Sequence, residues 1–221
     1  MGKIITLDTN RTSGPIGAYL AEPAGKPKGG IVVIQEIFGV NAHIRSVADR
    51  FAAEGYVAIA PALFDPIEKG VETGYDNEGM QKGVKLIAEL GLARPLDDVE
   101  VAAKAIAYAG KVGTVGYCWG GTIALMAALR LGLPSASYYG SRNVPFLTEK
   151  AKAPVIFHFG EKDHSIPPEM VQKHRELMPT MDTYVYDADH GFNCDARGSY
   201  DAAAAKLAMD RTLAFFAKYL G

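Results

Sequence analysis

The sequence predicts an α/β protein with a mostly parallel central sheet and helices on both faces. Short apolar runs bounded by glycine or proline alternate along the chain with longer segments of helical periodicity. Strands that alternate with helices of this length are joined by right-handed crossovers, which make neighbouring strands parallel. No linker, repeat or low-complexity segment divides the chain, so residues 1–221, of which 48% are hydrophobic, are expected to form a single domain.

The first part of the chain is predicted to enter the sheet through a hairpin. Residues 3–8 and 15–21 have the pattern of two short strands, with the turn signal RTSGP between them. The continuous apolar runs at 29–36 and 56–61 indicate strands that are buried on both faces. Between these runs, residues 43–55 have apolar positions at helical spacing and end in glycine, which predicts a helix.

After Pro61 the alternation of strand-like apolar runs and helical segments becomes irregular. Residues 62–77 contain two turn signals and no clear period, which indicates an excursion over one edge of the sheet. The elements expected after it are helices near 78–90 and 96–109, a strand at 111–117, a helix at 119–131, strands at 135–140 and 154–160, a helix at 168–178, a strand at 182–187 and a helix at 200–220.

Composition and charge narrow the partners to small molecules. The 23 basic and 25 acidic residues give a net charge of −2. This balance does not indicate a protein that binds nucleic acid or anionic lipid. The uncharged run 112–129 is just long enough to span a bilayer, but its four glycines favour a soluble strand–turn–helix. The N-terminus has too few apolar residues for a secretory signal, and two cysteines make no disulfide framework. We therefore expect a cytoplasmic protein, a monomer or a weak homodimer.

One short motif, residues 116–120, indicates a catalytic cysteine. Cys118 lies between Gly116 and Gly120, in a strand-to-helix turn at the carboxyl end of a predicted strand, where doubly wound sheets bind ligands. This is the pattern of a nucleophile elbow with cysteine in place of serine. The helix that begins at Trp119 would direct its amides at the thiolate and at the oxyanion formed on attack. The alternative is that Cys118 is a small core residue.

Two further residues follow in the order that such enzymes use. Asp163 is predicted just past the end of one strand, and His190 follows the last strand 27 residues later. An acid and a histidine on neighbouring loops at one edge of the sheet can converge on an elbow several strands away. The other histidines have weaker positions, and no Cys/His spacing predicts a zinc site, so we expect no metal and no cofactor.

The chain resembles the dienelactone hydrolase family, cysteine hydrolases of the α/β-hydrolase fold. The resemblance covers essentially the whole chain and is carried by QEIFGVN at 35–41, GYCWGG at 116–121, GEKDHSIP at 160–167 and HGFN at 190–193. It implies a cofactor-independent hydrolase that cleaves an activated ester or lactone through a thioester acyl-enzyme. The combination of EIFG after the third strand with a cysteine elbow is quite specific.

The resemblance also implies residue roles. Cys118 would be the nucleophile, His190 the base and Asp163 the residue that orients it. The oxyanion hole would be formed by the backbone N–H groups of Ile37 and Trp119. Glu36 would lie beside the thiol and keep the sulfur protonated until substrate displaces the carboxylate. The alternative for Glu36 is a structural carboxylate paired with a backbone amide or a basic side chain.

The chain differs from better-known members of this family in the residues expected to line the substrate pocket. Those members bind the substrate carboxylate with arginines, one of them at the position that is Cys194 here, and residues 51–93 contain no arginine. Arg197 is a candidate substitute, with a surface salt bridge as the alternative. Two other functions stay open: a thiol redox or sensor protein that uses Cys118 and Cys194, and a non-catalytic binding module that keeps the fold.

Overall fold

A computed structural model describes residues 2–9 and 14–221 and shows a central eight-stranded sheet. The strand order is β1-β2-β4-β3-β5-β6-β7-β8, and the pairs from β4 to β8 are parallel. The strands are β1 (Lys3–Leu7), β2 (Ile16–Ala21), β3 (Gly30–Ile34), β4 (Val57–Pro61), β5 (Val112–Tyr117), β6 (Ser135–Tyr138), β7 (Val155–Gly160) and β8 (Asp182–Tyr186).

The expected hairpin at the start of the chain is confirmed. β1 and β2 pair antiparallel from Lys3 opposite Leu20 to Leu7 opposite Ile16, and β2 then pairs antiparallel with β4. Most of the expected turn between the two strands lies outside the described residues.

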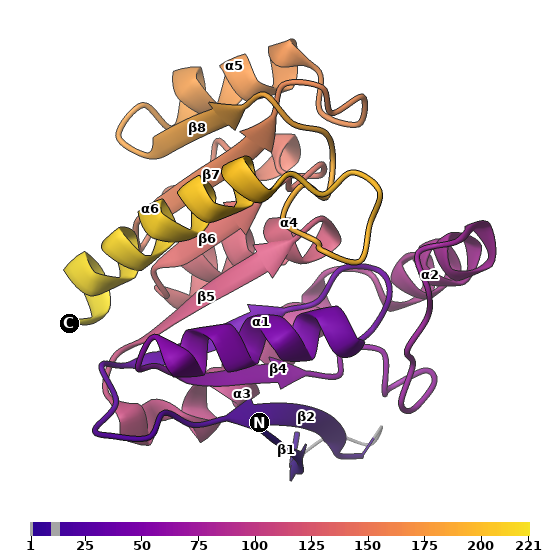
Figure 1. The fold of residues 1–221 in the computed structure, drawn as a ribbon, viewed down its shortest axis with the longest axis vertical. Coiled ribbons are helices and arrows are strands. Elements are labelled where there is room, and N and C mark those ends of the chain that lie inside the picture. Colours follow the sequence, from indigo (N-terminus) through magenta and orange to yellow (C-terminus); the bar gives the residue numbers. More distant parts are fainter. Residues whose placement is uncertain (1, 10–13) are drawn as a thin grey trace.

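Helices cover both faces of the sheet, as Figure 1 shows. They are α1 (Ala42–Ala53), α2 (Asn77–Leu90), α3 (Ala93–Ala105), α4 (Trp119–Met126), α5 (Pro168–Leu177) and α6 (Ala202–Leu220). Successive residues of β3 point to opposite faces: Ile31 and Val33 pack in the core with α1 and α6, whereas Val32 and Ile34 pack in the core with α3 and α4. A buried strand of this kind has apolar residues at every position, which explains the unbroken run in the sequence.

Three of the predicted boundaries differ from those in the structure. The expected helix over 119–131 is α-helical only to Met126 and continues as a π-turn over Ala127–Leu131. The strand expected at 135–140 ends at Tyr138, because Tyr139 adopts a left-handed conformation with φ 39°. The helix expected at 96–109 begins at Ala93 and is α-helical to Ala105.

The excursion after β4 lies against the carboxyl ends of the strands rather than over one edge of the sheet. Its Phe64 ring stacks on Trp119 with ring centroids 5.6 Å apart, and Glu72 forms an isolated bridge with Gly39. Figure 1 shows this segment and α2 beyond the arrowheads of the central strands. The excursion therefore forms part of the wall of the region where ligands bind in this class of sheet.

Among the described residues, no helix combines the length and the apolar character that crossing a membrane requires.

Candidate active site

Cys118 stands at a strained turn between β5 and α4. Its φ of 54° and ψ of −119° lie outside the regions that residues with a Cβ normally adopt. The turn is also too tight for neighbours with side chains. A Cβ on Gly116 would meet the Gly120 carbonyl oxygen, and a Cβ on Gly120 would meet the Gln35 carbonyl oxygen. The turn is therefore as tight as a nucleophile elbow requires, and a strained conformation held by its surroundings is typical of a functional position, whereas the role of Cys118 as nucleophile stays a prediction.

Asp163 and His190 meet at the same edge of the sheet. They lie on the loops after β7 and β8, and the Nδ1 atom of His190 is 2.6 Å from Oδ2 of Asp163. The other carboxylate oxygen of Asp163 accepts a hydrogen bond of 2.8 Å from the backbone N–H of Ser165. The Asp163 side chain is fully buried, so both of its oxygens are fixed by these partners.

The imidazole of His190 connects this carboxylate to the elbow. Burial alone would lower the pKa of His190, but the hydrogen bond with Asp163 and the interaction with Cys118 outweigh it and raise the pKa to about 10. The ring also packs against Tyr139, with centroids 5.0 Å apart. The Asp163 carboxylate is hydrogen-bonded to His190, and together with the interaction with Cys118 it stabilises the imidazolium form.

Glu36 lies in the loop just after β3 and is 1% exposed. Its Oε1 atom is 3.3 Å from a guanidinium nitrogen of Arg197, whereas its Oε2 atom is buried without a hydrogen-bond partner. The basic partner expected in the structural alternative is therefore present. The structure places the Cys118 thiol with His190 and the Glu36 carboxylate with Arg197, so the role of Glu36 beside the thiol stays a prediction.

Arg197 is not the surface residue that its alternative supposed. Its side chain is only 18% exposed, and its guanidinium lies 5.9 Å from the ring centre of Phe38 and 5.7 Å from that of Tyr75. Gly191 makes room for it, because a Cβ there would lie 2.7 Å from a guanidinium nitrogen. Burial would lower the pKa of Arg197, but the nearby negative groups, first of all Glu36, together outweigh burial and raise it, so the guanidinium stays charged in a largely buried place.

The two amides proposed for an oxyanion hole, those of Ile37 and Trp119, lie at a turn and at a helix start, respectively. Trp119 is the first residue of α4, where a backbone N–H has no acceptor within the helix. Ile37 lies in the turn after Glu36 and is packed closely against Gly83 of α2. Across the described part of the chain, neither amide is hydrogen-bonded to another group. Their assignment as an oxyanion hole stays a prediction.

Other histidines prove structural or belong to a second cluster. His158 is bonded on one side to Tyr186 and on the other to Thr212, and burial lowers its pKa to about 3. Burial likewise lowers the pKa of His174 to about 4. His43 is different, because its side chain lies near Glu36 and Cys194 in a buried group of potential metal ligands that the sequence did not predict.

Tyr139 is a site residue that sequence reasoning missed. It directly follows β6, is fully buried, and combines a left-handed φ with direct packing against His190. Nothing in the motif SASYYG distinguishes it from an ordinary strand residue, because its conformation depends on contacts with distant loops.

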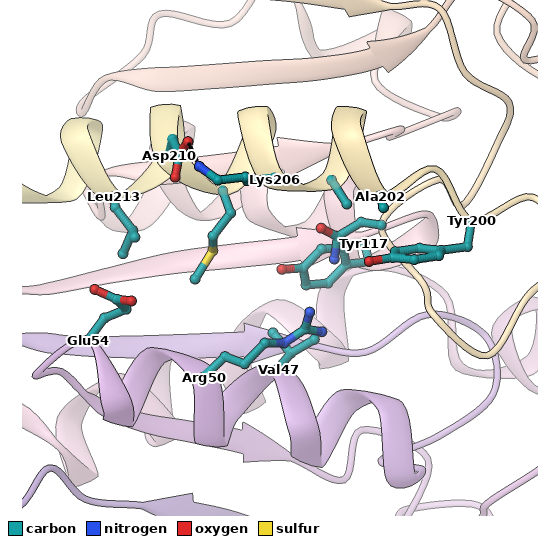
Figure 2. A pocket seen from close by; sticks show the side chains of 12 residues that line it. Val47, Arg50, Glu54, Tyr117, Tyr200, Ala202, Lys206, Asp210 and Leu213 are labelled. Atoms are coloured by element: carbon teal, nitrogen blue, oxygen red, sulfur yellow. Dashed lines mark hydrogen bonds and ion pairs between the residues drawn. The ribbon is translucent and has the colours of Figure 1, made fainter.

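A cavity of about 260 Å³ lies between α1 and α6, as Figure 2 shows. The residues around it include Arg50, Tyr117, Tyr200 and Lys206, but none of Cys118, Asp163 or His190. It is separate from the elbow, and it touches the site only through Tyr117 and Asn193, which adjoin the elbow and the His190 loop.

Cys118 itself is partly exposed, and both cysteines are free thiols.

Comparisons with known proteins identify the family of the chain. The model of the dienelactone hydrolase family matches residues 16–220. A putative carboxymethylenebutenolidase from Synechocystis is 38% identical over 91% of each chain, and a carboxymethylenebutenolidase from Pseudomonas putida is 32% identical over 91% of this chain and 90% of its own.

Among solved structures, a putative dienelactone hydrolase from Klebsiella pneumoniae superposes with a TM-score of 0.83 at 32% identity, covering 99% of this chain and 100% of its own. The sheet has the order and the crossovers of the α/β-hydrolase fold. The chain therefore belongs to the dienelactone hydrolase family.

Proposed function

We propose that the protein cleaves activated esters or lactones of small molecules through a thioester acyl-enzyme on Cys118. The observation that carries this proposal is the hydrogen bond between Asp163 and His190, beside which Cys118 stands in a strained elbow and interacts with the imidazole. Carboxymethylenebutenolidases among the relatives support the same class of substrate. The fixed orientation of the imidazole is what a nucleophile and its base require.

The reaction has two stages. The Cys118 sulfur attacks the carbonyl carbon and its proton passes to the Glu36 carboxylate, while the negative charge on the carbonyl oxygen is met by the amides of Ile37 and Trp119. The tetrahedral adduct collapses with cleavage of the carbon–oxygen bond, and the imidazolium of His190 gives a proton to the leaving oxygen. Water then attacks the thioester with His190 as base, which releases the acid, and Glu36 returns its proton to the Cys118 sulfur.

The leaving group decides which substrates are turned over. A tetrahedral adduct expels its less basic group, and a thiolate is far less basic than an amine, so adducts of amides mostly revert. An enol or aryl oxygen leaves readily. The site is therefore better suited to lactones and activated esters than to peptides.

Arg197 is the proposed contact for an anionic substrate group. It is charged and largely buried, and among the described residues its ion pair is the long contact to Glu36, beside its packing on Phe38 and Tyr75. A substrate carboxylate that bound this guanidinium would compete with Glu36 for it and would leave Glu36 free to turn toward the sulfur. Binding would thereby couple recognition of the substrate to activation of the nucleophile.

The direct test is hydrolysis of p-nitrophenyl acetate, with rapid quenching and mass spectrometry of the intact protein and of its peptides. We expect turnover and an added acetyl group on the peptide that contains Cys118. A peptide p-nitroanilide of similar size should be turned over far more slowly. Absence of ester turnover, or an acyl group on another residue, would refute the proposal.

A second prediction concerns Glu36 as the acceptor of the Cys118 proton. Glu36→Gln keeps the shape of the side chain but removes its charge and its ability to take a proton. We expect ester turnover to fall by about 10²-fold. The thiolate fraction, measured by ultraviolet absorbance and by the rate of alkylation, should rise because a negative charge beside the sulfur is gone.

Glu36→Ala is the less informative variant, because it leaves the Arg197 guanidinium buried and unpaired, which costs about 3–5 kcal/mol. Thermal unfolding of both variants separates loss of fold from loss of activity. The role of Glu36 is wrong if the wild type already rests as a thiolate near neutral pH, or if Glu36→Gln is as fast as the wild type.

A further inference from the structure

Three buried side chains with metal-binding atoms converge in the interior of the protein. Glu36 comes from the loop after β3, His43 from the first turn of α1, and Cys194 from the loop before α6. One potential ligand atom of each lies within 4.8 Å of the other two, and all three residues are buried. No spacing motif predicts this group, because the fold brings together residues that are up to about 160 positions apart.

Two of the three residues present atoms that have no partner. Oε2 of Glu36 and Nε2 of His43 are both buried without a hydrogen bond. The residues are 1% and 4% exposed. Buried polar atoms are almost always satisfied, so two unsatisfied atoms in one cluster point to a group that binds between them.

The orientation of His43 fits ligation. Its Nδ1 atom is 3.0 Å from Oδ1 of Asp195, a carboxylate that is half exposed at the edge of the cluster. A carboxylate at Nδ1 holds the proton there and leaves the lone pair on Nε2, the tautomer that binds a metal through Nε2. Carboxylate–histidine–metal arrangements of this kind recur in metalloproteins, where the outer carboxylate fixes the ring.

We propose that Glu36, His43 and Cys194 form a binding site for a divalent transition metal of the zinc class. Thiolate, imidazole and carboxylate are all zinc ligands, and three of them leave the fourth tetrahedral position open. The Glu36 carboxylate and the Cys194 thiolate neutralise the two positive charges of the ion. The positive charge of Arg197 and the negative charge of Asp195 cancel each other. Ligand atoms around zinc lie about 3.5 Å apart, so small side-chain rotations must draw the three together.

Binding has two chemical consequences. Burial raises the pKa of Cys194 to about 11, so the free thiol is protonated, and coordination releases its proton to the solvent. Glu36 would also be held by the metal and could no longer take the Cys118 proton. We therefore expect the metal to inhibit ester turnover; only this second consequence rests on the proposed function.

The test is titration of the full-length, metal-free protein with Zn²⁺ by calorimetry and with Co²⁺ by absorption spectroscopy, both without substrate. We expect one ion per chain and, with Co²⁺, a thiolate-to-metal absorption band in the near ultraviolet. Cys194→Ser should remove that band and weaken Zn²⁺ binding by at least about tenfold. Cys118→Ala is the matched control, because it removes the other thiol and should retain both signals.

Asp195→Asn tests the positioning of His43 without removing a ligand. Asp195 is half exposed, so the variant is expected to fold, and Zn²⁺ binding should weaken about 10- to 100-fold while the Co²⁺ thiolate band persists at saturation. The exposed His164 provides a control variant, His164→Ala, with unchanged binding.

Three results would overturn the proposal: no stoichiometric binding, binding of unchanged affinity in Cys194→Ser, or binding that disappears in Cys118→Ala. The last would place the metal on Cys118 and His190 instead. These measurements do not require turnover. They therefore test the metal proposal independently, even if the ester assay fails.

Discussion

Cys118→Ala is expected to lower hydrolysis of p-nitrophenyl acetate by about 10⁴-fold or more, the scale of loss seen when a covalent nucleophile is removed. The sulfur is the atom that forms the proposed acyl-enzyme, and no other group in the hydrogen-bonded chain of Asp163 and His190 can replace it. The variant should fold. Alanine keeps the Cβ, so the strain at φ 54° is unchanged, and loss of one small, partly exposed sulfur costs little in packing.

Two measurements make this prediction decisive. Thermal unfolding should show Cys118→Ala within a few degrees of the wild type, and kcat/KM should be measured against the uncatalysed rate under the same conditions. Turnover retained in Cys118→Ala would refute the mechanism. If activity were retained there but lost in Cys194→Ala, the chemistry would belong to the second, fully buried thiol.

The elbow and its partners could be predicted because their signals are local. Gly116 and Gly120 flank the cysteine within five residues, and the structure shows that a Cβ at either position would collide with backbone. Asp163 and His190 each follow a buried strand directly, and parallel strands deliver the residues after them to one edge. Short-range pattern and topology therefore locate these three side chains without knowledge of packing.

The remainder of the site depends on contacts that no local pattern encodes. Glu36 and Arg197 pair across 161 residues of sequence, and His43 meets Asp195 across 152. The left-handed conformation of Tyr139 is likewise imposed by its surroundings. The sequence could offer Arg197 as a substrate contact or a surface residue, but not as the buried partner of Glu36, because burial of a charge is decided by the assembled loops.

His190→Ala is expected to lower ester turnover by about 10³- to 10⁴-fold, because the base and the acid that protonates the leaving group are both lost. Asp163→Asn should approach this loss although the imidazole is retained. The Ser165 N–H donates to one oxygen of Asp163, and asparagine would keep its oxygen there. The amide NH₂ would then face His190.

An NH₂ group facing Nδ1 of His190 forces that nitrogen to accept a hydrogen bond, so the proton moves to Nε2 and points at Cys118. An imidazole in that tautomer has no lone pair on Nε2 with which to take a proton from the attacking water, and losses of about 10⁴-fold follow from this change in a serine protease triad. Nitrogen NMR of His190 should show the exchanged tautomer in Asp163→Asn, with thermal unfolding close to the wild type. Asp187→Asn makes the same chemical change at an exposed ion pair with Lys162 and should leave turnover unchanged. If Asp163→Asn stays within about tenfold of the wild type, Asp163 does not set the tautomer, and His190 works without an orienting carboxylate.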